Sequence, residues 1–192
     1  MQRIGDVYTC TSGLLQSRIK ESFDKASPIY KIYGQKELNE DLMGIENEEM
    51  NGKEIRTDMD IRLTYEGQIL ISTISGKAAI VDSIHSQYAW TQNYVELIAK
   101  KTNSINKWYM TYLFNEHPFI RKQIRQSQQG SQVIRYSTQL IKQLRLPKLP
   151  ALSIQARIGD IYRKENKIQA LRHRVADNRY RVQLAKLERI GK

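Results

Sequence analysis

A heptad repeat of apolar residues near the end of the chain constrains its fold more than any other feature. From Ser153 onward the sequence contains no proline, and apolar side chains recur every seven residues, which predicts one long helix with a coiled-coil seam. At about 1.5 Å per residue this helix would be on the order of 60 Å long, more than one small domain can cover. The seam must therefore meet a helix from a second copy or from a partner chain. The predicted seam residues are Ile154, Ile161, Ile168, Val175 and Val182 at one heptad position, and Leu171, Asn178 and Ala185 three residues later.

The predicted helix also contains residues that are unfavourable for a coiled coil, and it carries a large positive charge. Arg157, Lys164 and Asn178 lie on the seam and Gly159 lies within the helix, so we expect them to weaken it, and buried polar seam residues more often set register than add stability. Residues 151–192 also carry eleven Lys and Arg against four Asp and Glu. These charges have two interpretations, a solvated face of the coiled coil or a basic rod near a phosphate backbone or an acidic protein.

The first part of the chain has a mixed pattern. β-branched residues with short polar separators predict neighbouring antiparallel strands, and apolar residues at helical spacing predict two helices after them. Two prolines in the stretch 146–150 (LPKLP) indicate a boundary between a domain at 1–150 and the helix at 151–192. The expected fold is α+β: a small mixed or antiparallel sheet with packed helices, followed by one long C-terminal coiled-coil helix. The expected strands are 4–11, 30–33, 68–74, 78–81 and 94–98, with a turn at Asn51-Gly52, helices at 106–115 and 118–128, and a further short strand after Gly130-Ser131.

The charge balance favours a polyanionic partner. Thirty-one Lys and Arg against 20 Asp and Glu give a net charge of +11, which makes nucleic acid the first candidate. Cys10 is the single cysteine, so no disulfide can form within the chain, and a reducing cytoplasm fits. The N-terminus lacks an apolar signal region and no apolar run is long enough to span a membrane, so we expect a cytoplasmic protein without a membrane partner.

The motifs of the common catalytic sites are missing. The ten glycines form no Gly-x-Gly loop for a nucleotide, and no Asn/Asp-Pro-Pro-aromatic motif of an amino-methyltransferase occurs. His85, His117 and His173 lack metal-ligand spacing and are expected to be surface or hydrogen-bonded structural histidines, and Cys10 a small buried residue. A nuclease-like set is Asp160, Glu165 and Lys167, but it falls inside the heptad helix, where these side chains spread around a charged surface. We therefore expect no catalytic residue, metal or cofactor.

The order of several short segments carries a resemblance to a known family. The segments are 4–7 (IGDV), 11–13 (TSG), 67–76 (GQILISTISG), 129–134 (QGSQVI), 146–150 (LPKLP) and the start of the long helix around Gln155. In this order the chain resembles the specificity subunits of type I restriction–modification systems. The match runs over nearly the whole chain.

The resemblance implies a non-catalytic DNA-reading subunit. Full-length members carry two target-recognition domains, each followed by a long helix, and the two helices pack antiparallel. With one domain and one helix, this chain would be a half-subunit, and a homodimer would restore the full arrangement and read a bipartite, palindromic site on double-stranded DNA. Methylation and cleavage would belong to partner modification and restriction subunits, which bind S-adenosylmethionine, ATP and magnesium. The alternatives are a coiled-coil decoy that binds modification subunits without productive DNA recognition, a truncated fragment, or, least supported, a standalone enzyme.

The family's domain reads DNA with loops from a small sheet, and amide and guanidinium groups suit base edges whereas Lys, Ser and Thr suit phosphates. Gly130 would let the backbone approach DNA closely. The aromatic set Trp90, Trp108, Tyr109 and Tyr112 is expected to form core and not a base-stacking platform. The predicted DNA-contacting residues are Tyr33, Gln35, Lys36, Thr73, Ser75, Lys77, Gln92, Ser131, Gln132 and Arg135.

Overall fold

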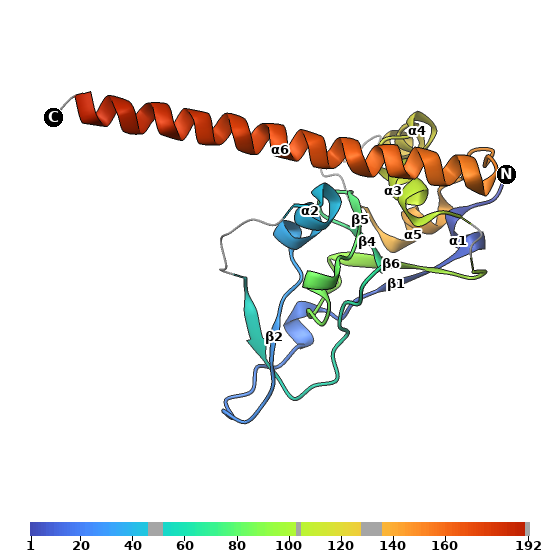
Figure 1. Cartoon of the computed structure of the whole chain (residues 1–192). Coiled ribbons are helices and arrows are strands. Elements are labelled where there is room, and N and C mark those ends of the chain that lie inside the picture. The colour runs from blue at the N-terminus through green and yellow to red at the C-terminus, as the bar shows by residue number, and fades with distance from the viewer. Residues whose placement is uncertain (46–51, 103–104, 128–135, 191–192) are drawn as a thin grey trace.

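The computed structural model describes residues 1–45, 52–102, 105–127 and 136–190 of the chain. Its helices and strands, in chain order, are α1 (Ile4–Val7), β1 (Tyr8–Ser12), the 3-10 helix η1 (Gln16–Arg18), β2 (Ile29–Lys31), α2 (Gln35–Met43), β3 (Glu54–Arg56), β4 (Ile69–Ser72), β5 (Ala78–Ile80), the 3-10 helix η2 (Ser83–His85), β6 (Tyr94–Ala99), α3 (Lys107–Asn115), α4 (Pro118–Ser127), α5 (Thr138–Gln143) and α6 (Leu152–Ile190). The architecture confirms the expected α+β class with one long C-terminal helix (Figure 1).

A four-stranded antiparallel sheet forms the centre of the domain. Its strand order is β1-β6-β4-β5, and Leu97 of β6 pairs with Cys10 of β1 on one side and Ile69 of β4 on the other. A second, two-stranded sheet joins β2 to β3. The antiparallel neighbours predicted from the short separators are thus confirmed for 68–74, 78–81 and 94–98.

Both faces of the four-stranded sheet are buried. Ile69 and Ile71 of β4 belong to a core that includes side chains of α1, α3, α4 and α5, whereas Leu70 belongs to a second core with Leu38 and Leu42 of α2. Successive strand residues point to opposite faces, so a strand covered on both sides is expected to be apolar at consecutive positions. This explains the unbroken run Ile69-Leu70-Ile71.

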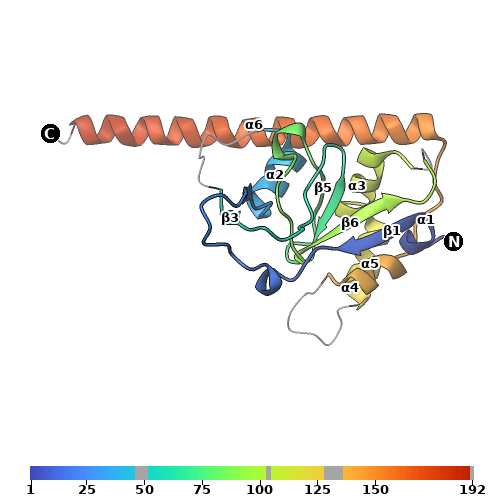
Figure 2. The same cartoon turned by 90° about the horizontal axis from the view of Figure 1, so that it is seen from below.

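Helix α6 runs across the β5 side of the domain. Helices α2 and α3 both contact β5 and α6, and α3 lies between the sheet and α6 (Figure 2). Gln155 is buried and its amide oxygen accepts a hydrogen bond from the backbone N–H of Asn106 at 3.0 Å. Gly159 lies so close to α3 that a Cβ atom there would be 2.8 Å from the backbone nitrogen of Tyr109. This glycine, expected to weaken the helix, is the contact point that brings α6 against the domain.

Several sequence predictions need correction or lie outside the described residues. The strand predicted over 4–11 begins only at Tyr8, because Ile4–Val7 form α1, where the backbone N–H of Ile4 bonds to the carbonyl of Leu144. The strand predicted over 68–74 ends at Ser72, where the chain turns. Asn51 and the start of the strand predicted after Gly130-Ser131 lie outside the described residues, and Thr138–Gln143 form a helix that the sequence analysis did not predict.

The aromatic and cysteine predictions hold. Trp90 and Tyr109 are 2% and 4% exposed and belong to the two cores, and Trp108 and Tyr112 are half-buried against them. Cys10 is buried in the core of the sheet, where burial raises the pKa of its thiol.

Candidate nucleic-acid interface and helix seam

Several predicted DNA-contacting residues meet at one end of the four-stranded sheet. Antiparallel pairing of Ser72 with Tyr94 brings the β4–β5 turn beside the segment that precedes β6. Thr73 donates two hydrogen bonds to the carbonyl of Asn93, from its backbone N–H at 2.8 Å and from its hydroxyl at 3.1 Å. The Ser72 hydroxyl and the side chain of Gln35, the first residue of α2, lie 3.1 Å apart and are hydrogen-bonded. We call this the sheet-end surface, and its predicted members are Gln35, Thr73, Ser75, Lys77 and Gln92.

The turn that carries most of these residues is fixed in shape. The Ser72 hydroxyl accepts hydrogen bonds from the backbone N–H groups of Ile74 and Ser75. Gly76 has φ +64°, and a Cβ atom there would fall 2.0 Å from the ring of Tyr136, so only glycine fits without displacing that ring. A preorganised turn of this kind holds Lys77 outward, where its side chain is exposed.

The other predicted contact residues do not join this surface. Tyr33 is only 1% exposed and its hydroxyl donates to Asp41 at 2.6 Å, so it lies inside the domain and cannot touch DNA, which corrects its assignment. Lys36 is half-buried and lines a groove of about 710 Å³ between α2 and α6, together with His173 and Arg181. Gly130, Ser131, Gln132 and Arg135 lie outside the described residues.

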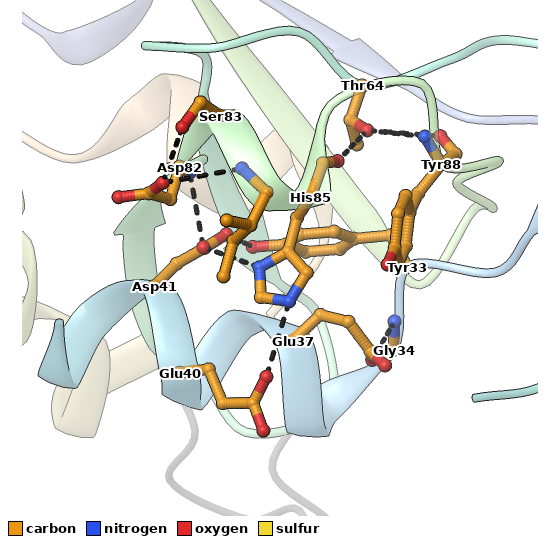
Figure 3. A network of polar contacts seen from close by, with 11 residues as sticks. Tyr33, Gly34, Glu37, Glu40, Asp41, Thr64, Asp82, Ser83, His85 and Tyr88 are labelled. Atoms are coloured by element: carbon orange, nitrogen blue, oxygen red, sulfur yellow. Dashed lines mark hydrogen bonds and ion pairs between the residues drawn. The ribbon is translucent and has the colours of Figure 1, made fainter. Parts of the chain in front are cut away.

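A buried polar network anchors α2 to the sheet (Figure 3). Both ring nitrogens of His85 face carboxylates, with Nδ1 2.6 Å from Asp41 and Nε2 3.2 Å from Glu40. Asp41 also accepts hydrogen bonds from the Tyr33 hydroxyl and the Asp82 backbone N–H. Burial and the Asp41 carboxylate raise the pKa of Tyr33 well above its ordinary value, so its hydroxyl remains the donor. The network confirms His85 as a hydrogen-bonded structural histidine, and it holds the helix whose first residue is Gln35.

The His85 network makes stability depend on pH. Burial alone lowers the pKa of His85, but the hydrogen bond and charge of Asp41, with the charges of Glu40 and Glu37, raise it above 6.5 overall. A raised folded-state pKa stabilises the protein fully below the unfolded pKa, and this stabilisation is lost as the pH rises through the folded pKa. We expect the free energy of unfolding in urea to fall as the pH rises above about 6.5 and through the raised pKa of His85, and to fall less in His85→Gln.

The matched control for that experiment is His173→Gln, since His173 is exposed on α6. It should keep the wild-type pH dependence when all unfolding curves are measured at one protein concentration. A wild-type stability that rises across this range, or an unchanged slope in His85→Gln, would show that His85 is not the titrating group.

The predicted seam of α6 lies on the face turned away from the domain. At about 100° per residue, Ile161 and Ile168 point roughly opposite to Gln155, Gly159 and Tyr162, which face the domain. Ile161 is 61% exposed and all eight predicted seam residues are exposed on the single chain. Beyond the domain, α6 continues without cover (Figure 1).

The nuclease-like set is not assembled into a site. Asp160, Glu165 and Lys167 are all exposed on α6, and Asp160 forms a 2.6 Å ion pair with Lys164 one turn later. At about 100° per residue, Glu165 points roughly 140° away from Asp160 around the helix axis. Within the described parts of the chain, no group of three or more His, Cys, Asp or Glu side chains could hold a metal ion, and no helix is long and apolar enough to cross a membrane.

Sequence reasoning missed Ser72, which it placed in a strand without a role in the site. The Ser72 hydroxyl accepts hydrogen bonds from the backbone of Ile74 and Ser75 and is hydrogen-bonded to Gln35. It therefore fixes the turn and holds the first residue of α2 beside it.

The molecule is thus a sheet domain with both sheet faces covered, joined to a long helix whose apolar seam is exposed on the single chain. The fold is similar to the HsdS subunit from Thermoanaerobacter tengcongensis, with a TM-score of 0.55 over 91% of this chain and 38% of that chain at 15% identity. It is also similar to a chain of a structure that addresses complex assembly and conformational transition of the type I R-M system, with a TM-score of 0.60 over 95% of this chain and 46% of that chain at 13% identity.

These similarities establish the fold expected from the resemblance. The chain spans less than half the length of either solved chain. No protein-family model matches the sequence, and no curated protein matches it.

Proposed function

We propose that this chain is a non-catalytic DNA-recognition subunit of a type I restriction–modification system, and that it acts as a homodimer of half-subunits. The observation that carries the proposal is the pairing of two features in the HsdS-like fold. Loops from separate strands and from α2 converge on the sheet-end surface, and the apolar seam of α6 faces away from the domain. The first feature suits recognition, and the second suits assembly.

The seam supports a two-fold dimer. An isolated helix gains little from exposing isoleucines, whereas two copies packed through the same face would bury Ile154, Ile161, Ile168, Val175 and Val182 on each. An antiparallel pair would place the domains, assigned to 1–150, at opposite ends of a rod formed by residues 151–192. Two identical domains related by a two-fold axis would read two identical half-sites, which makes the expected DNA target an interrupted palindrome.

The residues of the sheet-end surface suit different kinds of contact with DNA. Lys77 is exposed and suited to a phosphate, and the exposed amide of Gln92 is suited to a base edge. The Gln35 amide is hydrogen-bonded to Ser72 and Asn39, and it would have to give up one of these bonds to contact a base. The Thr73 hydroxyl donates to Asn93 and the Ser75 hydroxyl is buried, so these two residues mainly shape the turn. Lys36 would contribute from the groove between α2 and α6 only if DNA also approaches that side.

The chemistry is proposed to reside in partner subunits. Under this proposal, modification subunits bind this dimer and methylate the site that it selects, and restriction subunits join the same complex. S-adenosylmethionine, ATP and magnesium would then be bound by those partners.

The proposal is tested by co-purification with the modification subunits encoded beside this chain, followed by mapping of methylated DNA. We expect a stable complex and methylation at one interrupted palindrome. A complex that methylates no defined site would instead identify a decoy that occupies modification subunits. Methyl transfer by the purified chain alone would contradict its assignment as a non-catalytic subunit.

A further inference from the structure

A long stretch of the chain carries positive charge without any acidic residue. Residues 117–159 contain eight Lys and Arg and no Asp or Glu. The described part of this stretch includes α4, α5 and the segment that joins α5 to α6. None of the large apolar side chains exposed on the described surface lies between residues 99 and 151. The surface of this region therefore consists mainly of cations, amides and hydroxyls.

Four cations are brought together around α1. Arg3 and Arg145 form an antiparallel bridge pair, so their side chains lie on the same side. Lys100 donates from Nζ to the Gly5 carbonyl at 2.6 Å, and a Cβ atom at Gly5 would lie 3.0 Å from the carbonyl oxygen of Lys142. All four cationic side chains are exposed. They come from both ends of the domain sequence and from β6, so the folded chain gathers them.

Helix α4 adds a fifth cation. The side-chain amide of Gln123 donates to the Arg145 carbonyl at 2.9 Å and accepts from the Arg145 backbone N–H at 2.8 Å, which fixes α4 beside this residue. Lys122, the neighbour of Gln123 on α4, is exposed. We call the surface formed by these five cations the basic face, and its members are Arg3, Lys100, Lys122, Lys142 and Arg145.

The charge of the basic face is not balanced by its own chain. The exposed acidic residues nearest to its members in sequence are Asp6 and Glu116, two carboxylates against five cations. Asp6 already accepts a hydrogen bond from the backbone N–H of Arg3 at 2.7 Å. Within the described residues, no member of the basic face forms an ion pair. Crowded like charges repel one another, so this face is stabilised by a polyanionic partner.

The composition of the basic face favours the DNA backbone over an acidic protein. Stable protein–protein interfaces have an apolar centre that is rich in aromatic residues, and this region exposes no large apolar side chain. Protein–DNA interfaces are more polar and much more positively charged. Lys and Arg that contact phosphates bind without regard to sequence.

The basic face and the sheet-end surface lie at opposite ends of the sheet. Tyr94, the first residue of β6, pairs with Ser72 at the sheet-end surface, whereas Lys100 follows the last residue of β6. Six strand residues span about 20 Å, the length of about six base pairs. In Figures 1 and 2, β1 and β6 run roughly along α6, and α1 lies near the start of α6, away from its free end. A duplex that follows the rod of the proposed dimer would meet the basic face farther from the centre of the rod.

We propose that the basic face binds the phosphate backbone outside each half-site, about six base pairs beyond the bases read at the sheet-end surface. The inference rests on the proposed DNA-reading function. It adds a contact that is independent of sequence and that holds the outer end of each domain on the duplex, so that the recognition turn keeps its register.

The test compares wild type with the variant Lys142→Ala, Arg145→Ala, each in complex with the modification subunits. A duplex recovered by the wild-type complex from a random-sequence pool is shortened stepwise from its outer ends, and affinity is measured by fluorescence anisotropy over a series of salt concentrations. We expect wild type to lose affinity once fewer than about six base pairs remain outside each half-site. The variant should bind the full duplex roughly tenfold more weakly and respond much less to shortening. Its salt dependence should fall by about two phosphates per protomer, with an unchanged ratio of specific to non-specific affinity.

The matched control is Lys142→Arg with Arg145→Lys, which keeps both charges and should keep the wild-type affinity, salt dependence and response to shortening. Wild-type values in the alanine variant would overturn the proposal and leave the DNA-reading function in place. Loss of co-purification with the modification subunits in that variant, with unchanged DNA affinity of the chain alone, would identify an acidic protein partner and also overturn it. If the wild-type complex recovers no duplex from the pool, the proposed function fails, and the role of the basic face fails with it.

Discussion

Replacing Ile161 and Ile168 together by Asp is expected to convert the proposed dimer into monomers. In an antiparallel pair each substitution would bury a carboxylate against the partner seam, and an unpaired buried charge costs several kcal/mol. Four such charges per dimer exceed what a seam of this length can supply. Sedimentation should therefore show a mass of 22.5 kDa for the variant and twice that mass for wild type.

The matched control places the same two charges on α6 away from the seam. Ala156→Asp with Gln183→Asp adds two carboxylates at positions roughly 80–100° from the seam direction on a helix of about 100° per residue. This variant should stay dimeric. Because the seam residues are exposed on the single chain, Ile161→Asp with Ile168→Asp should also leave the domain folded, with an unchanged near-ultraviolet signal from Trp90 and Trp108. A dimeric variant would mean that copies associate through another surface.

The long helix and the central strands could be predicted because their signals are local. The heptad of α6 is repeated over several turns, and the strands 69–72, 78–80 and 94–99 are rich in apolar residues, with a short separator between the first two. Short elements lacked such signals. Helix α1 has four residues and depends on a hydrogen bond from Ile4 to Leu144, a contact between opposite ends of the domain.

The candidate site was predictable only where it lies in turns. The β4–β5 turn was marked by Ser75-Gly76-Lys77, and antiparallel pairing then brings Gln92 beside it. Tyr33 was misassigned because the acceptor of its hydroxyl, Asp41, is eight residues away on the next helix, which the sequence alone did not reveal. Gly159 was interpreted as a weakness for the same reason. Gly159 lets α6 pack closely against α3, and that contact exists only in the folded chain.

The second large effect is expected on DNA binding, which Lys77→Ala and Gln92→Ala should weaken in different ways. A lost phosphate contact weakens binding to all sequences, whereas a lost base contact weakens only the specific site, by about 1–3 kcal/mol or roughly fivefold to 150-fold. We expect Lys77→Ala to lower affinity for specific and scrambled duplexes alike, and to reduce the salt dependence of binding by about one phosphate per protomer. Gln92→Ala should leave the salt dependence intact and lower only the ratio of specific to non-specific affinity.

These two signatures are measured by fluorescence anisotropy over a series of salt concentrations. One duplex is recovered by the wild-type complex from a random-sequence pool, and the other is its scrambled counterpart. Lys148→Ala is the control for Lys77, because Lys148 is exposed but lies in the segment that joins α5 to α6, away from the sheet-end surface. It should reproduce the wild-type affinity and salt slope. An unchanged salt slope in Lys77→Ala would show that Lys77 does not contact a phosphate. An unchanged specificity ratio in Gln92→Ala would show that this end of the sheet does not read bases. Both results together would mean that the sheet-end surface does not face DNA, because Lys77 lies on the fixed β4–β5 turn and Gln92 lies on the segment paired beside it.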